Sequence, residues 1–211
     1  DERKLGRGLA YWKEQLAGIP ERLELPADRP RPMVQTYAAR SCRLRLTPAV
    51  LASLTSLNQA NHTTLYMTML AAYAALLQRY SGQSDIVIGS PIANRQDAQL
   101  EKLVGFFVNS LVLRVQVRPE ASFRELLSDV ARVTLDAYQH QDVPFEKLVE
   151  ALSPERSFGH TPIFQIVFAF QNAPTVPQTL EGLEVESISG GELLVRFDLE
   201  LHAVEKDGGV D

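Results

Sequence analysis

The feature that most constrains this chain is a pair of interrupted apolar runs, IGSPIANR at residues 88–95 and VGFFVNSL at residues 104–111. Both runs contain the β-branched and aromatic residues that favour strands, but each contains a glycine and the first also contains Pro91. Glycine weakens a strand and proline removes one donor from its ladder. The pattern predicts that the backbone leaves a sheet near Gly89, crosses another part of the protein and returns near Asn109. A crossing of this kind is typical of a binding site.

Helical and strand-like patterns alternate along the rest of the chain. Helices are expected at residues 5–17, from the Thr47-Pro48 cap onward, from Thr63 or Thr64 to Ser81, from a capping box at Ser122 and Glu125 to about Gln139, and from Pro144 to Leu152. Strands are expected at residues 41–46, 85–88, 110–117, 163–170, 181–188 and 192–204. Strands interleaved with helices predict an α/β fold, with a mixed β-sheet packed with α-helices.

Four prolines follow the first helix, at positions 20, 26, 30 and 32. Proline is excluded from helix interiors and central strands, so this segment is expected to run extended over a surface. Either a strap across the fold or a plain linker between two domains fits the pattern.

Composition narrows the class of protein. A net charge of −5 with no basic cluster argues against a nucleic-acid partner. The single cysteine, Cys42, excludes an internal disulfide and a cysteine-based zinc site, and it favours a cytoplasmic location. No apolar run is long enough to cross a membrane, and no carboxylate or histidine cluster has metal-ligand spacing. We therefore expect a protein with no membrane partner and no metal site.

The interrupted runs also resemble a known family. The condensation domains of nonribosomal peptide synthetases carry the segment IGxPxANR and then IGxFVNTL in their carboxyl-terminal half. Further similar segments follow in the same order, HQDVPFEKLV at residues 140–149, TPIFQIVF at 161–168 and RFDL at 196–199. Upstream, YWKEQL at 11–16 and LELPADRP at 23–30 resemble the middle of the family. The resemblance covers nearly the whole chain.

The resemblance implies one lobe of the chloramphenicol-acetyltransferase-like fold, in which two lobes form a V with a tunnel between them. Residues 1–36 would be a helix and Pro-rich interlobe linker, and residues 37–211 the carboxyl-terminal lobe. The family's catalytic signature, HHxxxDG, belongs to the amino-terminal lobe, which the chain is expected to lack. None of the four histidines, His62, His140, His160 and His202, forms this signature. No catalytic residue is therefore expected in this chain.

The activity that the resemblance implies is amide-bond formation in secondary metabolism, such as antibiotic or siderophore biosynthesis. An aminoacyl or peptidyl thioester would react with a second aminoacyl group, each delivered on the phosphopantetheine arm of a peptidyl carrier domain. The expected partners are the amino-terminal lobe, carrier domains and an adenylation domain, and the fragment alone is expected to be inactive. Two alternatives stay open: a non-catalytic docking lobe for carrier or adenylation domains, and the corresponding lobe of an epimerisation domain.

The resemblance also assigns roles to two groups of residues. Asn109, with Ser110 beside it, would line the substrate tunnel, although an asparagine at a strand start is also a common turn or register residue. Gly89, Pro91, Asn94 and Arg95 would belong to a segment that crosses toward the other lobe. The alternative for this segment is a tight loop with Arg95 in a surface ion pair.

The segment that begins at His140 has a structural interpretation. His140 ends a helix, where a positive charge is favourable, and Asp142 is placed to cap the next helix. Pro144 and Phe145 then fall in the first turn, and the segment is expected to fix two helices against the sheet. Exposed apolar surface is expected near residues 105–111 and 171–179, where a missing lobe would pack.

Overall fold

The computed structural model describes residues 2–95, 98–101, 103–152, 158–171, 183, 193–206 and 208–211. Its helices are α1 (Glu2–Gln15), α2 (Pro48–Asn61), α3 (Leu65–Ser81), α4 (Ala98–Glu101), α5 (Phe123–Gln139) and α6 (Phe145–Leu152). Its strands are β1 (Asp85–Ile92), β2 (Asn109–Gln116), β3 (Ile166–Gln171), β4 (Leu199–Lys206) and β5 (Gly209–Val210).

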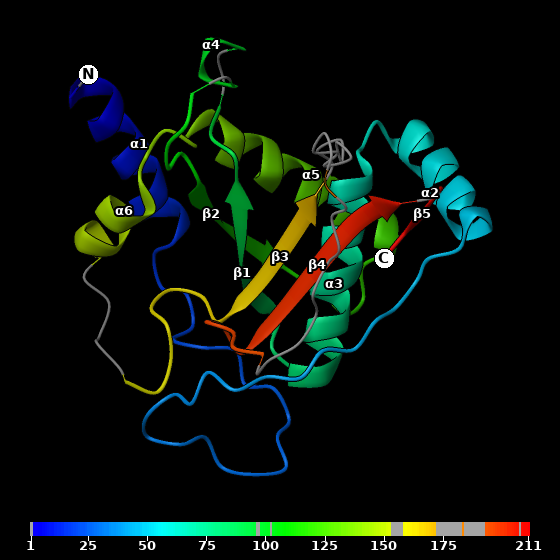
Figure 1. Ribbon diagram of the computed structural model, residues 1–211, viewed down its shortest axis with the longest axis horizontal. Helices are drawn as coiled ribbons and strands as arrows, with labels where there is room; N and C mark the ends of the chain where they lie inside the picture. Colours follow the sequence, from blue (N-terminus) through cyan, green and yellow to red (C-terminus); the bar gives the residue numbers. More distant parts are fainter. Residues whose placement is uncertain are drawn as a thin grey trace.

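The strands form one mixed sheet in the order β2-β1-β3-β4-β5. Strand β1 is antiparallel to β2 and parallel to β3, β3 is parallel to β4, and β4 is antiparallel to β5. Helices α3 and α5 cover one face of the sheet, α1 and α6 lie beside β2, and α2 lies at the opposite edge near β5 (Figure 1). A mixed sheet packed with helices is the architecture that the sequence predicts.

The helix boundaries follow from local capping. The hydroxyl of Thr64 accepts a hydrogen bond from the Met67 amide at 3.2 Å, and Gly82 ends α3 with a φ of 72°. In α5 the Ser122 hydroxyl accepts from the Glu125 amide at 3.3 Å, while the Glu125 carboxylate accepts from the Ser122 amide at 2.8 Å. These bonds hold the pKa of Glu125 below its ordinary value. The predicted caps of both helices are confirmed.

Helix α1 packs into the same core as the sheet. Trp12 and Leu16 are each 2% exposed, and both belong to the main hydrophobic cluster. The Arg114 guanidinium, on β2, donates to the carbonyls of Gln15 and Ala17 at 3.0 and 2.8 Å. A cation at these last carbonyls is favourable because the helix dipole is negative there. The assignment of residues 1–36 to an interlobe linker stays a prediction, but their helix is integral to this fold.

The Pro-rich segment after α1 runs extended below the sheet, as its prolines predict (Figure 1). We call residues 20–46 the strap. Two glutamine side chains hold its first part. Gln165 accepts from the Leu23 amide and donates to the Glu21 carbonyl, both at 3.3 Å. Gln83 accepts from the Glu24 amide at 2.6 Å and donates to the Arg22 carbonyl at 3.2 Å.

Strand β1 is longer than the sequence suggests, and the prediction that the chain leaves the sheet near Gly89 is wrong. Gly89 pairs with Val112 and Pro91 with Ser110, so the ladder continues to Ile92. The reason for the glycine is steric. A Cβ atom at Gly89 would overlap the ring of Phe164, which lies directly against this position. Glycine here permits close packing inside a strand rather than ending it.

Other strand predictions need correction. Residues 41–46 form no strand, since only Leu46 bridges to another segment, at Val210, and Leu44 is 76% exposed. The alternation of apolar and polar residues predicted a strand, but no neighbouring strand is present to pair with this segment among the described residues. Strand β3 begins at Ile166 rather than 163 and β4 at Leu199 rather than 192, while β5 had no clear signal. The strand expected at 181–188 lies outside the described residues, apart from Leu183.

We expect Gly89→Ala to destabilise the protein by about 2 kcal/mol or more, because the added methyl forces Phe164 out of its position. Urea unfolding of the purified chain measures this. Gly6→Ala is the matched control, since a Cβ at this exposed helical position meets nothing within 4 Å. That control should be neutral or stabilising. A Gly89→Ala protein with unchanged stability would contradict the packing argument.

Candidate functional site

The structure brings Asn109 together with the segment at residues 140–145. The side-chain nitrogen of Asn109 donates to the carbonyls of Gln141 and Val143, both at 2.9 Å. Its side-chain oxygen accepts from the Phe145 amide at 3.0 Å, at the first residue of α6. Asn109 is 8% exposed; its bond to Val143 is buried, and its bonds to Gln141 and Phe145 are partly buried. We call Asn109 with residues 140–145 the Asn109 cluster.

This arrangement gives Asn109 a structural task that the tunnel assignment did not include. Both donor hydrogens of the amide are used, and its oxygen keeps one free lone pair. The residue also sits at the first position of β2, opposite Ile92. Ser110 follows it opposite Pro91, half-buried in the ladder. The role of Asn109 and Ser110 in a substrate tunnel stays a prediction.

His140 lies at the C-terminus of α5, as expected. Its backbone amide bonds to the carbonyls of Ala137 and Tyr138, and its own carbonyl accepts from the Trp12 indole at 3.1 Å. Its ring stacks on Tyr11, with the ring centroids 4.0 Å apart. Burial raises the pKa of Tyr11 to about 12. These contacts support the structural interpretation of the segment.

The other members of this segment also make structural contacts. Asp142 forms an ion pair with Lys4 of α1. The ring of Phe145 packs against that of Phe164, with centroids 5.3 Å apart, and Pro144 precedes the first residue of α6. Helices α1 and α6 are therefore tied to each other through residues 140–145.

Asn94 and Arg95 follow the end of β1. Asn94 adopts a left-handed conformation, with a φ of 52°, which asparagine tolerates better than most residues. The Arg95 guanidinium lies 4.1 Å from the centroid of the Phe107 ring and donates to the Leu100 carbonyl. The surface ion pair that we considered for Arg95 is not among its contacts with the described residues. The crossing toward a second lobe stays a prediction for Gly89, Pro91, Asn94 and Arg95.

The described part of the loop between β1 and β2 exposes apolar side chains. Val104 is fully exposed, Phe106 is 89% exposed and Val108 is 52% exposed. The expectation of apolar surface near 105–111 holds for Phe106 and Val108, whereas Leu111 is buried. The second expected patch, at 171–179, lies outside the described residues apart from Gln171.

Two buried polar contacts were not predicted from the sequence. Gln165, 3% exposed, joins the strap to the start of β3. The Tyr66 hydroxyl, on α3, donates to the Ser90 hydroxyl on β1 at 2.8 Å, and burial raises the pKa of Tyr66. A polar residue inside an apolar run was the only available signal for Ser90 and Gln165, and such a signal does not identify the partner.

Within the described ranges, no group of three or more His, Cys, Asp or Glu residues is placed to hold a metal ion. In the same part of the chain, no helix has the length and apolar character needed to cross a membrane. His160 contacts Glu21 at 3.2 Å and His202 contacts Glu200 at 3.0 Å. Neither of these two pairs belongs to the Asn109 cluster, and the expectation that this chain holds no catalytic residue stays a prediction.

We expect Asn109→Ala to lower the free energy of unfolding by about 3 kcal/mol, because it leaves one buried carbonyl, one partly buried carbonyl and one partly buried amide unpaired. His140→Ala should cost about 1 kcal/mol, the value of one aromatic stack, since its backbone bonds remain. Urea unfolding of both variants gives the comparison. Equal losses would mean that the bonds of Asn109 are replaced by water.

We also expect the chain to self-associate through the exposed loop between β1 and β2, because exposed apolar patches favour association. The double variant Val104→Ser and Phe106→Ser should lower the fraction of dimers and larger species in a dilution series followed by light scattering. Leu135→Ser, at an exposed apolar position on α5, is the control and should leave association unchanged. A monomer at every concentration of the unmodified chain would contradict this prediction.

Comparisons with known proteins place the chain in a family. The family model described as Condensation domain matches residues 2–211. One of the linear gramicidin synthase proteins of Brevibacillus parabrevis is 44% identical over 208 residues, which cover 98% of this chain and 3% of the relative. Phosphinothricin tripeptide synthetase PhsC of Streptomyces viridochromogenes is 42% identical over 172 residues, covering 82% of this chain and 16% of the relative.

Solved structures show the same relationship. The X-domain from teicoplanin biosynthesis superposes with a TM-score of 0.90 at 27% identity, covering 98% of this chain and 48% of that one. The condensation domain of the Monacolin K polyketide synthase MokA superposes with a TM-score of 0.80 at 25% identity, covering 95% and 49%. The chain thus spans about half of each of these structures and has the chloramphenicol-acetyltransferase-like fold. It belongs to the condensation-domain family of the nonribosomal peptide synthetases.

Proposed function

We propose that this chain is the carboxyl-terminal half of a condensation domain and that it forms amide bonds together with an amino-terminal half. The observation that carries the proposal is the share of the solved structures that this chain covers. Residues 2–211 match the family, yet the chain spans 48% and 49% of two solved structures of this fold. The sequence also has no adjacent histidines, so the HHxxxDG signature would come from the other half.

The proposed reaction joins an amine to a thioester carbonyl. The amine nitrogen attacks the carbonyl carbon and forms the new carbon–nitrogen bond of a tetrahedral intermediate, which then collapses to the amide as the carbon–sulfur bond breaks. The nitrogen loses one proton and the departing thiolate gains one, so no external oxidant or reductant is needed. Because the thioester is already activated, positioning of the two groups carries much of the catalysis. The Asn109 cluster would serve this by holding β2, α5 and α6 in one arrangement.

The substrates would arrive on the phosphopantetheine arms of carrier domains, as parts of a larger synthetase with an adenylation domain. Support comes from relatives of which this chain spans only a few per cent. A solved four-domain nonribosomal peptide synthetase, bound to AMP and glycine, also contains a region that superposes with a TM-score of 0.87 at 25% identity. The phosphopantetheine arm is a tethered substrate in this proposal and not a resident cofactor.

One observation favours a second candidate, a lobe that docks partners without chemistry. The X-domain from teicoplanin biosynthesis was solved in a complex with OxyB, and it superposes on this chain with a TM-score of 0.87 at 28% identity. A domain of this fold can therefore bind another protein. The exposed side chains of Val104 and Phe106 would suit such a surface.

The experiment that tests the proposal is a chimera. The chain replaces the corresponding half of a condensation domain in the 44% identical linear gramicidin synthase protein, and amide formation between two carrier-bound aminoacyl groups is measured by mass spectrometry. We expect turnover within about a hundredfold of the parent, because a misfit at the seam of about 1 Å costs a factor of that size. The matched control replaces the second histidine of the HHxxxDG signature in the other half by alanine and should lose turnover.

The outcomes separate the candidates. A folded chimera that binds carrier domains but forms no amide would overturn the proposal in favour of docking. A chimera that inverts the stereochemistry of a bound aminoacyl group without joining two of them would favour epimerisation. Chiral analysis of the released amino acids detects that change.

The 211-residue chain alone should form no amide above the uncatalysed rate, because half of the positioning surface and the proposed proton-handling histidine are missing. The same mass-spectrometric assay with both carrier-bound substrates measures this. Product formation by the purified chain, above a heat-denatured control, would show that this half contains a complete active site.

A further inference from the structure

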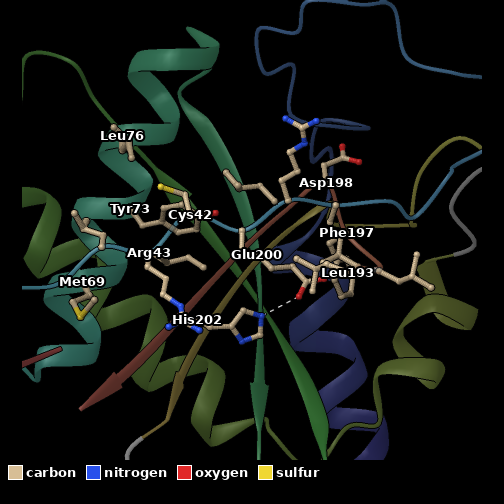
Figure 2. Close-up of a pocket in the computed structure, with 18 of the residues that line it drawn as sticks. Cys42, Arg43, Met69, Tyr73, Leu76, Leu193, Phe197, Asp198, Glu200 and His202 are labelled. Atoms are coloured by element: carbon tan, nitrogen blue, oxygen red, sulfur yellow. Dashed lines mark hydrogen bonds and ion pairs between the residues drawn. The ribbon is translucent and has the colours of Figure 1, made fainter. Parts of the chain in front are cut away.

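A pocket of about 1300 Å³ lies between α3, β4 and the strap (Figure 2). None of residues 103–111 or 140–145 lines it. Helix α3 contributes Met69, Tyr73 and Leu76, and the strap contributes Cys42 and Leu44. Ligand pockets are typically apolar with a few placed polar groups, and this lining has that character.

The buried hydroxyl of Tyr73 is the first sign of a ligand. Tyr73 is 6% exposed, and its hydroxyl has no hydrogen-bond partner among the described residues. Its ring lies against that of Phe168, with centroids 6.1 Å apart, which holds the side chain in place. Burial raises the pKa of Tyr73, so the hydroxyl stays protonated and able to donate at neutral pH. A buried donor without an acceptor costs free energy, and an acceptor brought by a ligand would recover it.

The charged side chains that line the pocket are the second indication of a ligand. Arg31 is held by Asp198, with one bond of 2.9 Å, and His202 by Glu200 at 3.0 Å. Arg43 makes no ion pair or hydrogen bond with the described residues, and Figure 2 shows its side chain extending across the pocket toward His202. The two carboxylates of the lining are thus engaged, whereas the guanidinium groups of Arg43 and of Arg40, which also lines the pocket, are not engaged by the described residues. The unbalanced charge is positive, which suits an anionic ligand.

We propose that this pocket binds a fatty carboxylate. The alkyl chain lies along the apolar wall formed by Met69, Leu76 and Leu44, and the carboxylate pairs with Arg43 and accepts a hydrogen bond from Tyr73. The Tyr73 hydroxyl is buried, so the ligand reaches it when the side chains around it move. The strap is held on both sides of Cys42–Leu44, by the backbone hydrogen bond from Ala39 to Leu193 before them and by those between Leu46 and Val210 after them.

Calorimetric titration of the 211-residue chain with dodecanoate, below its micelle concentration, tests the proposal. Arg43→Gln should weaken binding about fivefold, as expected for loss of a partly exposed charged hydrogen bond. Tyr73→Phe should weaken it about threefold and should raise the melting temperature of the ligand-free chain, because the unpaired hydroxyl is gone. Arg29→Gln, at an exposed strap position outside the pocket, is the matched control and should change neither property.

Cys42 supplies an independent readout, since it is the single cysteine, is exposed and lines the pocket. Dodecanoate should slow its alkylation by iodoacetamide, whereas acetate and dodecyltrimethylammonium should not. The absence of dodecanoate binding would overturn the proposal. Binding that leaves Cys42 unprotected, that is insensitive to both variants, or that is matched by dodecyltrimethylammonium would also overturn it. None of these outcomes depends on amide formation by the chain.

Discussion

Much of the arrangement depends on the side-chain amide of Asn109, because one buried group joins β2 to the connection between α5 and α6. The same connection positions α1, whose Trp12 indole donates to the carbonyl of His140. Helices α1 and α6 thus share one anchor on the sheet. Removing that anchor would leave several buried backbone groups unpaired at once, and such groups are expensive to bury without partners.

The Asn109 cluster and the pocket beside the strap have different properties. The Asn109 cluster is hydrogen-bonded, which suits a part of the molecule that must keep its geometry. In the pocket, the Tyr73 hydroxyl and the Arg43 guanidinium have no polar partner among the described residues. Gln165 ties the strap to the sheet, because its side chain binds the strap while its backbone carbonyl accepts from the Asp198 amide just before β4.

The proposed reaction depends more on how the protein positions the two substrates than on reactive side chains. A thioester needs no further activation, so under this proposal the half-domain would contribute by fixing the surfaces that align two tethered substrates. The dense contacts of residues 140–145 fit that task. The exposed side chains of Val104 and Phe106 fit a surface that is covered in a larger assembly.

The sequence alone determined the features that depend on local interactions. The capping box at Ser122 and Glu125, the extended Pro-rich strap and the mixed α/β pattern all come from residues close to one another along the chain. The tertiary structure alone decided that β1 continues through Gly89, because Phe164, far along the chain, fills the space of a side chain there. It also decided that Asn109 caps α6 and that residues 41–46 lack a strand partner. Packing between distant segments sets these features, and periodicity carries no information about which distant segments meet.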